Sequence, residues 1–147
     1  MDYPDKTLLA LIYDNWTLTT EGLKVTDIVF SQVDWRWDDG LQGVPNIVVQ
    51  KSTLRRLAEV EEYFAYNATV KAVYWSKTKN HADAVTDKDK IWAMVEHVKK
   101  ILHTSSLCPA TWNYMKVDAV NTRNEVPPLP QILQEELIVN IRLFWVP

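Results

Sequence analysis

The most regular feature of the chain is an alternation of apolar and wetter positions over residues 64–74. Every even position in this segment is apolar, whereas the odd positions between them include Asn67, Thr69 and Lys71. Successive side chains of a strand point to opposite faces of a sheet, so a period of two predicts a strand with one face on the core. Shorter apolar or alternating runs predict strands over residues 28–33, 46–50, 115–119 and 136–145.

Two segments carry the helical period instead. Residues 87–103 place six apolar side chains on one helix face: Ile91, Met94, Val95, Val98, Ile101 and Leu102. Asp87 and Asp89 suit the positive end of this helix, whose cap is expected at Thr86 or Asp87. Residues 5–16 predict a second, N-terminal helix behind Pro4, with a stripe made of Leu8, Leu9, Ile12 and Trp16.

The remaining segments are polar or broken by proline, so we expect loops over residues 34–45, 77–87, 104–113 and 127–130. Residues 52–60 are expected to form one or two helical turns, or an irregular crossing segment. The predicted order is α-β-β-(short helix)-β-α-β-β. This order predicts an α+β fold, a mixed and mainly antiparallel sheet with two helices packed on it, in a single domain over residues 1–147.

Composition and charge narrow the function classes. Of the 147 residues, 47% are apolar and 24% are charged, which are ordinary values for a globular domain. The formal charge of −3 gives no overall basic excess of the kind that nucleic-acid binders carry. No apolar run approaches the roughly 20 residues of a membrane span, and we expect no membrane partner and no secretory signal. A single cysteine, Cys108, excludes an internal disulfide.

Recognised catalytic and cofactor motifs are missing from the sequence. Three glycines are too few for a phosphate-cradling loop, so a nucleotide cofactor is not expected. His97 and His103 are six residues apart on one helix and do not share a face, and both are interpreted as solvated. His81 lacks a third metal ligand nearby, and Cys108 is interpreted as a partly buried, inert thiol. We therefore expect no metal, no cofactor and no catalytic residue.

Two alternatives stay open at this point. Carboxylates cluster at Asp34, Asp38 and Asp39 and at residues 59–62, so a small metal-dependent nuclease or hydrolase would need them to converge in the fold. A basic patch with interleaved aromatic rings would bind single-stranded nucleic acid. Its candidate members are Lys51, Arg55, Arg56, Lys71, Lys77 and Lys79, with Tyr74 and Trp75.

The sharpest candidate for protein contact is the segment Trp35, Arg36, Trp37 and Asp38. Its two tryptophans are two residues apart among aspartates and next to Gly40, so we expect at least one ring to be exposed. Tryptophan and arginine dominate the energetic centres of protein interfaces. The alternative is a loop folded back on its own domain.

The order of elements resembles the tail terminator (tail completion) proteins of long-tailed phages and archaeal tailed viruses. The resemblance covers nearly the whole chain. It rests on the N-terminal helix, the phrase Pro45-Asn46-Ile47-Val48-Val49, the long strand at 68–76, the amphipathic helix at 87–103 and the final strand pair at 115–146.

The resemblance implies a structural virion protein and no enzyme. Such proteins form a hexameric ring on the head-proximal end of the tail tube, stop its polymerisation and join the tail to the neck. The implied partners are other copies of the chain, the tail tube protein and a neck or head-completion protein, with DNA only passing through the lumen. The implied location is the virion tail, after synthesis in the host cytoplasm.

Three loops are expected to reach the tube, the neck or a neighbouring copy. Besides the segment at Trp35, they contain Lys77 and Lys79 in one loop and Pro127 and Pro128 in another. A head-completion or neck adaptor protein remains the alternative within the same class, because it would use the same ring architecture.

Replacing both rings by Trp35→Ala and Trp37→Ala is expected to weaken assembly by roughly tenfold or more while leaving the melting temperature nearly unchanged. Sedimentation of the double variant, alongside its thermal melt, measures both quantities. Loss of the folded state would instead assign these rings to the core.

Overall fold

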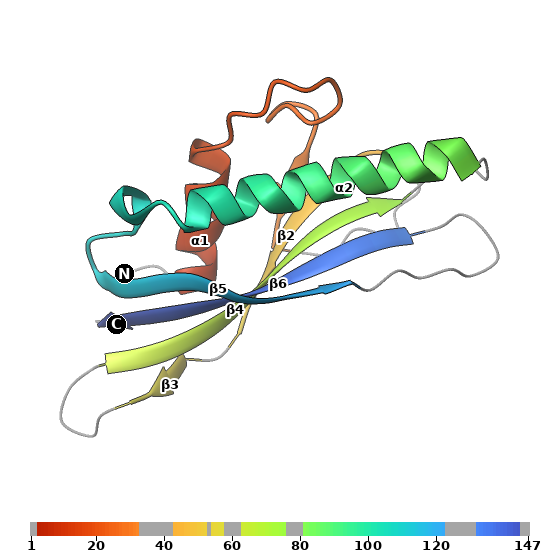
Figure 1. Ribbon diagram of the computed structural model, residues 1–147. Helices are drawn as coiled ribbons and strands as arrows, with labels where there is room; N and C mark the ends of the chain where they lie inside the picture. The colour runs from red at the N-terminus through yellow and green to blue at the C-terminus, as the bar shows by residue number, and fades with distance from the viewer. Residues whose placement is uncertain are drawn as a thin grey trace.

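The computed structural model describes residues 3–32, 43–52, 54–57, 63–75, 81–122 and 132–144. Within these residues two α-helices lie on one side of a mixed sheet of six strands (Figure 1). All strand pairs are antiparallel except the pair β1–β2. The predicted α+β class and its mainly antiparallel sheet are confirmed.

Along the chain, the elements are α1 (Pro4–Asp14), β1 (Val29–Ser31), β2 (Asn46–Gln50), β3 (Leu54–Arg56), β4 (Tyr63–Trp75), α2 (His81–Leu102), a 3-10 turn (Ser105–Leu107), β5 (Trp112–Thr122) and β6 (Ile132–Phe144). The strands lie in the order β1-β2-β4-β6-β5, and β3 also pairs with β4. Strands β5 and β1 therefore stand at opposite edges of the sheet.

The centre of the sheet is the ladder between β4 and β6, which runs over all 13 residues of β4. The even positions of β4 face the helices, as the alternation predicted. Tyr66, Ala68 and Val70 lie opposite Ile141, Val139 and Leu137, and all six side chains are fully buried. Burying one large apolar side chain contributes roughly 1.5–3 kcal/mol, so this layer is a main source of stability.

The prediction of helical turns or an irregular segment over residues 52–60 is wrong where the structure describes that segment. Leu54–Arg56 forms strand β3, which pairs with residues 64–66 of β4. β2 pairs with residues 69–73 of the same β4 edge, so β3 continues β2 beyond a short interruption. Pairing with the long β4 strand therefore outweighs local helix propensity.

Helix α2 is longer than predicted, because it begins at His81 and not near residue 87. Its first six residues carry no apolar stripe, so the sequence pattern hid them. Asp87 consequently lies inside the helix and is buried. Burial of Tyr74 raises the pKa of its hydroxyl, and the Asp87 charge raises it further. Neither helix in the described ranges has the length and apolar content needed to cross a membrane.

The face of the sheet that points away from the helices is more buried than its polar residues predicted. Lys71 and Glu136 are cross-strand neighbours on this face, their charged groups are 3.7 Å apart, and both side chains are largely buried. Gln134 donates a hydrogen bond of 3.0 Å to the Glu136 carboxylate. Buried charges require such partners, because an ion removed from water without a counter-charge is strongly destabilising.

Replacement of Lys71 by methionine is expected to destabilise the fold by about 3 kcal/mol, because Glu136 then loses the cation beside it. The double variant Lys71→Met with Glu136→Leu should recover most of that loss. Urea unfolding measures both, with Lys116→Met as the control, since Lys116 is exposed on the same face. Equal losses in Lys71→Met and Lys116→Met would contradict the role of the ion pair.

Candidate interaction surfaces

Strand β5 is an edge strand whose side chains are mostly accessible. Among the described residues it pairs only with β6, and Trp112 at its start is its one buried side chain. Two irregularities in the register, near residues 113 and 118, interrupt its pairing. An edge strand presents backbone groups that another strand can pair with, and bulges of this kind limit unwanted pairing. A contact made by β5 would therefore use its accessible side chains and not backbone pairing with another strand.

The helix-facing side of β5 is only partly covered by α2. α2 packs on β4, β6 and β5, yet Val117 and Val120 remain half-buried and exposed, respectively. Hollows between α2 and β5 are lined in part by Lys88, Trp92 and Thr122 at one end and by Lys99 and Val120 further along. We call this surface the β5 flank, and its members are Lys88, Trp92, Lys99, Val117, Val120 and Thr122.

Trp92 is the most exposed large apolar side chain in the described part of the chain, at 60%. It borders a hollow of about 330 Å³ together with Lys88, Asp89 and Glu135. A large ring left in water at this level has a function more often than a small side chain does, since tryptophan concentrates binding energy at interfaces.

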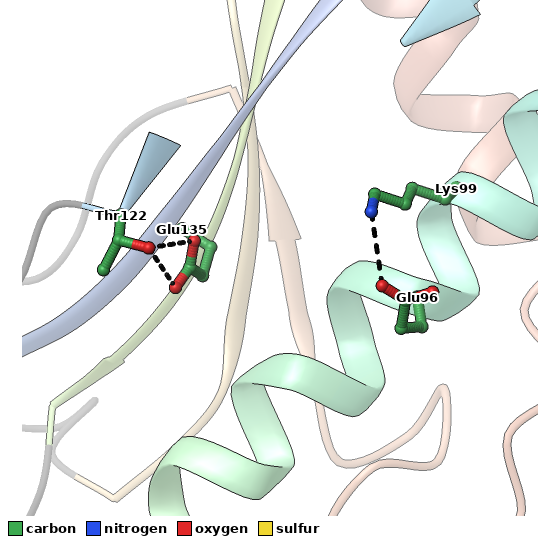
Figure 2. A network of polar contacts seen from close by, with 4 residues as sticks. All are labelled: Glu96, Lys99, Thr122 and Glu135. Carbon is green, nitrogen blue, oxygen red and sulfur yellow. Dashed lines mark hydrogen bonds and ion pairs between the residues drawn. The ribbon is translucent and has the colours of Figure 1, made fainter. Parts of the chain in front are cut away.

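Polar pairs lie on the elements that border the β5 flank (Figure 2). The Thr122 hydroxyl on β5 lies 2.8 and 2.9 Å from the two carboxylate oxygens of Glu135 on β6. On α2, Lys99 and Glu96 form an exposed ion pair at 3.3 Å. Exposed pairs such as these add little stability.

A second surface lies at the opposite edge of the sheet, where α1 packs on β2 and β1. The outward side of α1 and the segment leading into β1 enclose an open, mainly apolar hollow of about 490 Å³. We call it the α1 hollow, and it is lined by Lys6, Leu9, Ala10, Tyr13, Asp14, Val25, Ile28 and Phe30. Tyr13 is half exposed and packs edge-to-face on Phe30, with ring centroids 5.2 Å apart.

A partly buried polar contact joins these two parts of the molecule. The backbone N–H of Thr17 donates to Nε2 of His97 at 3.0 Å, and the Trp16 ring packs edge-on against the imidazole at 4.6 Å. Trp16 in turn donates to the Leu23 carbonyl at 2.8 Å. Gly22, at a φ of +82°, allows the tight turn that brings Leu23 back toward Trp16. His97 on α2 thus holds the segment that follows α1.

The interpretation of His97 as solvated is wrong. Its side chain is buried, because Trp16 and Thr17 cover it, whereas His103 is exposed as predicted. Burial lowers the pKa of His97, and the nearby Lys100 charge lowers it further. Cys108 is half-buried as predicted, and burial raises the pKa of its thiol.

The sequence-predicted contact residues Trp35, Arg36, Trp37 and Asp38 lie outside the described residues, as do Lys77, Lys79, Pro127 and Pro128. The carboxylates at 34–39 and 59–62 also fall outside them. Within the described residues no group of three or more His, Cys, Asp or Glu side chains is placed to hold a metal ion.

The described members of the predicted basic patch do not form one surface. Lys71 is buried beside Glu136, and Tyr74 is buried on the helix side of the sheet. Burial raises the pKa of Tyr66 to about 12, in the core beside Ser52.

Sequence reasoning did not single out Trp92 and Tyr13, two large side chains that the structure leaves exposed. One signal pointed to Trp92, since it lies outside the apolar stripe of its helix.

The chain matches no protein-family model and no curated protein. The surfaces above are therefore interpreted from their own geometry and chemistry.

Stability is expected to decrease as the pH falls from 7.5 to 5.5. The pKa of His97 in the folded protein lies below the 6.5 of the unfolded chain, so its contribution is complete above pH 6.5. It is lost as the pH falls through the folded pKa, because protonation opposes the hydrogen bond from Thr17. Urea midpoints across this range measure the loss.

His97→Gln should be less stable by roughly 1–2 kcal/mol at pH 7.5 and should lose this part of the pH dependence. His103→Gln is the matched control, because His103 is exposed directly after the end of the same helix. An unchanged pH profile in His97→Gln would contradict the assignment.

Proposed function

We propose that this chain is a structural virion protein that acts by contact and forms a closed ring, in the manner of tail terminators. The ring would cap the head-proximal end of a tail tube, stop its polymerisation and join tail to neck. The partners in this proposal are five further copies of the chain, the tube protein and a neck protein, while DNA passes through the lumen.

One observation supports the proposal most directly. The β5 flank combines an edge strand, an uncovered apolar side and an exposed tryptophan. The two bulges of β5 limit backbone pairing with another strand, so a contact at this edge would be made by side chains. Exposed Val120 and Trp92 beside such an edge have the composition of an interface core.

The order of elements is a second support. The sequence resemblance implied a small domain with an N-terminal helix, a long central strand, an amphipathic helix and a final strand pair. The described elements α1, β4, α2, β5 and β6 follow that order. Fold likeness alone does not determine function, so the assembly behaviour is the decisive test.

The purified protein is expected to form hexamers, alone or on addition of tube protein, and to limit the length of growing tubes. Native mass spectrometry gives the stoichiometry, and electron microscopy gives the tube lengths. A strict monomer at high concentration with no affinity for tube protein would falsify the ring.

Two variants of neighbouring residues locate the contact surface. Val120→Lys places a charge on the β5 flank and should lower assembly by roughly tenfold or more. Asn121→Lys is the matched control, since Asn121 is also exposed but faces the opposite side of the sheet. Equal assembly of both variants would remove the β5 flank from the interface.

A further inference from the structure

The segment between α1 and β1, residues 15–28, contains no helix or strand. Its turns are closed internally, for example by the N–H of Leu23, which donates to the Thr20 carbonyl at 2.9 Å. Among the described residues, one hydrogen bond links the segment to α2 or to the sheet, from the N–H of Thr17 to Nε2 of His97 at 3.0 Å. We propose that protonation of His97 in mild acid opens this segment locally, while the sheet stays folded.

The contact with the segment requires a neutral imidazole. Nε2 accepts the Thr17 N–H through its lone pair, and a proton on Nε2 would occupy that lone pair. The Trp16 ring lies edge-on against the imidazole, with ring centroids 4.6 Å apart. Because the His97 side chain is buried, a charge on it would be poorly solvated. Protonation therefore removes an acceptor and also places a charge beneath the segment.

The charged groups around the imidazole do not offset that cost. Burial lowers the pKa of His97, and the Lys100 ammonium on the same helix lowers it further. From the segment, the imidazole meets Trp16 and Thr17, and neither carries a charge. Within the described residues, no carboxylate of α1, of the segment or of the sheet raises this pKa. An imidazolium in the closed form is therefore without a counter-charge.

The open form of the segment binds a proton more readily than the closed form. When the segment opens, His97 meets water and its pKa returns toward the ordinary value of 6.5. The opening equilibrium thus shifts toward the open form as the pH falls below 6.5. This shift is complete once the pH is below the pKa of the closed form.

Opening of the segment can leave the sheet intact. Trp16, Leu23 and Ile28 lose buried positions when the segment opens, so the open form is a minor state at neutral pH. The ladder between β4 and β6 receives no hydrogen bond from the segment in the described ranges and stays paired. Because Val25 and Ile28 line the α1 hollow, the opening would change that candidate interaction surface.

Native-state hydrogen exchange followed by NMR tests the proposal on the full chain. Each exchange rate is divided by the intrinsic rate of that amide at the same pH. The sheet is reported by Val70 in β4, and the segment by the amides of Thr17, Leu23 and Asp27. The segment amides should exchange faster than Val70, and low urea should change their rates little, because a local opening exposes little surface. Lowering the pH from 7.5 to 5.5 should reduce their protection.

Three variants separate the role of His97 from a general loosening of the segment. His97→Gln should abolish the pH dependence of exchange in residues 15–28, because glutamine does not titrate. His103→Gln is the matched control and should keep that dependence. Gly22→Ala should speed exchange in the segment at both pH values and also keep the dependence. At Gly22 a φ of +82° strains any residue that has a Cβ, while the added Cβ would lie 4.0 Å from the tip of Lys90.

The outcomes are independent of the proposed ring. Segment amides that exchange at the rate of Val70, with the same urea dependence, would show that residues 15–28 open only when the whole domain unfolds, and the proposal would be overturned. Equal protection at pH 7.5 and pH 5.5, or a pH dependence that persists in His97→Gln, also overturns it. If His97→Gln does not fold, the NMR titration of the His97 ring in the wild-type chain decides, since a pKa at or above 6.5 contradicts the proposal.

Discussion

The pairing of β4 with β6 along its full length fixes where every other element lies. β2 and β3 share the other edge of β4, and among the described strands β5 has β6 as its only neighbour. Five strands about 4.8 Å apart make a sheet roughly 19 Å wide, and a helix is about 10–12 Å across. Because α1 packs on β2 and β1 while α2 packs mainly on β4 and β6, β5 is only partly covered and Val120 stays exposed.

This distribution of the helices makes the two edges of the sheet different from each other. At one edge β5 and the exposed Trp92 border a hollow with several charged residues, and at the other edge α1 and β1 border an open, mainly apolar one. A domain with two identical edges would favour paired dimers, whereas two different edges favour contacts that repeat around a circle. The proposed assembly therefore follows from how the helices are distributed over the sheet.

The sequence predicted the helix and strand segments in which one face is buried, because burial of one face imposes a regular apolar pattern. The alternation at 64–74 located β4, and the stripe from Ile91 to Leu102 located the packed part of α2. Prediction failed where tertiary pairing outweighs local pattern, as in β3, and where a helix continues without an apolar face, as before Asp87. Burial of His97 also escaped prediction, because Trp16 and Thr17, which cover it, are distant in sequence. The contact residues named from the sequence lie outside the described ranges, so those predictions stay untested.

The partly buried contact between Thr17 and His97 links two parts of the molecule that are distant in sequence. His97 lies on α2, which bears Trp92, and Thr17 belongs to the segment that leads to Val25 and Ile28 of the α1 hollow. Burial lowers the pKa of the imidazole, and its neutral Nε2 accepts the hydrogen bond from the Thr17 N–H. Protonation removes that acceptor, so the packing of the segment after α1 against α2 depends on pH through one side chain.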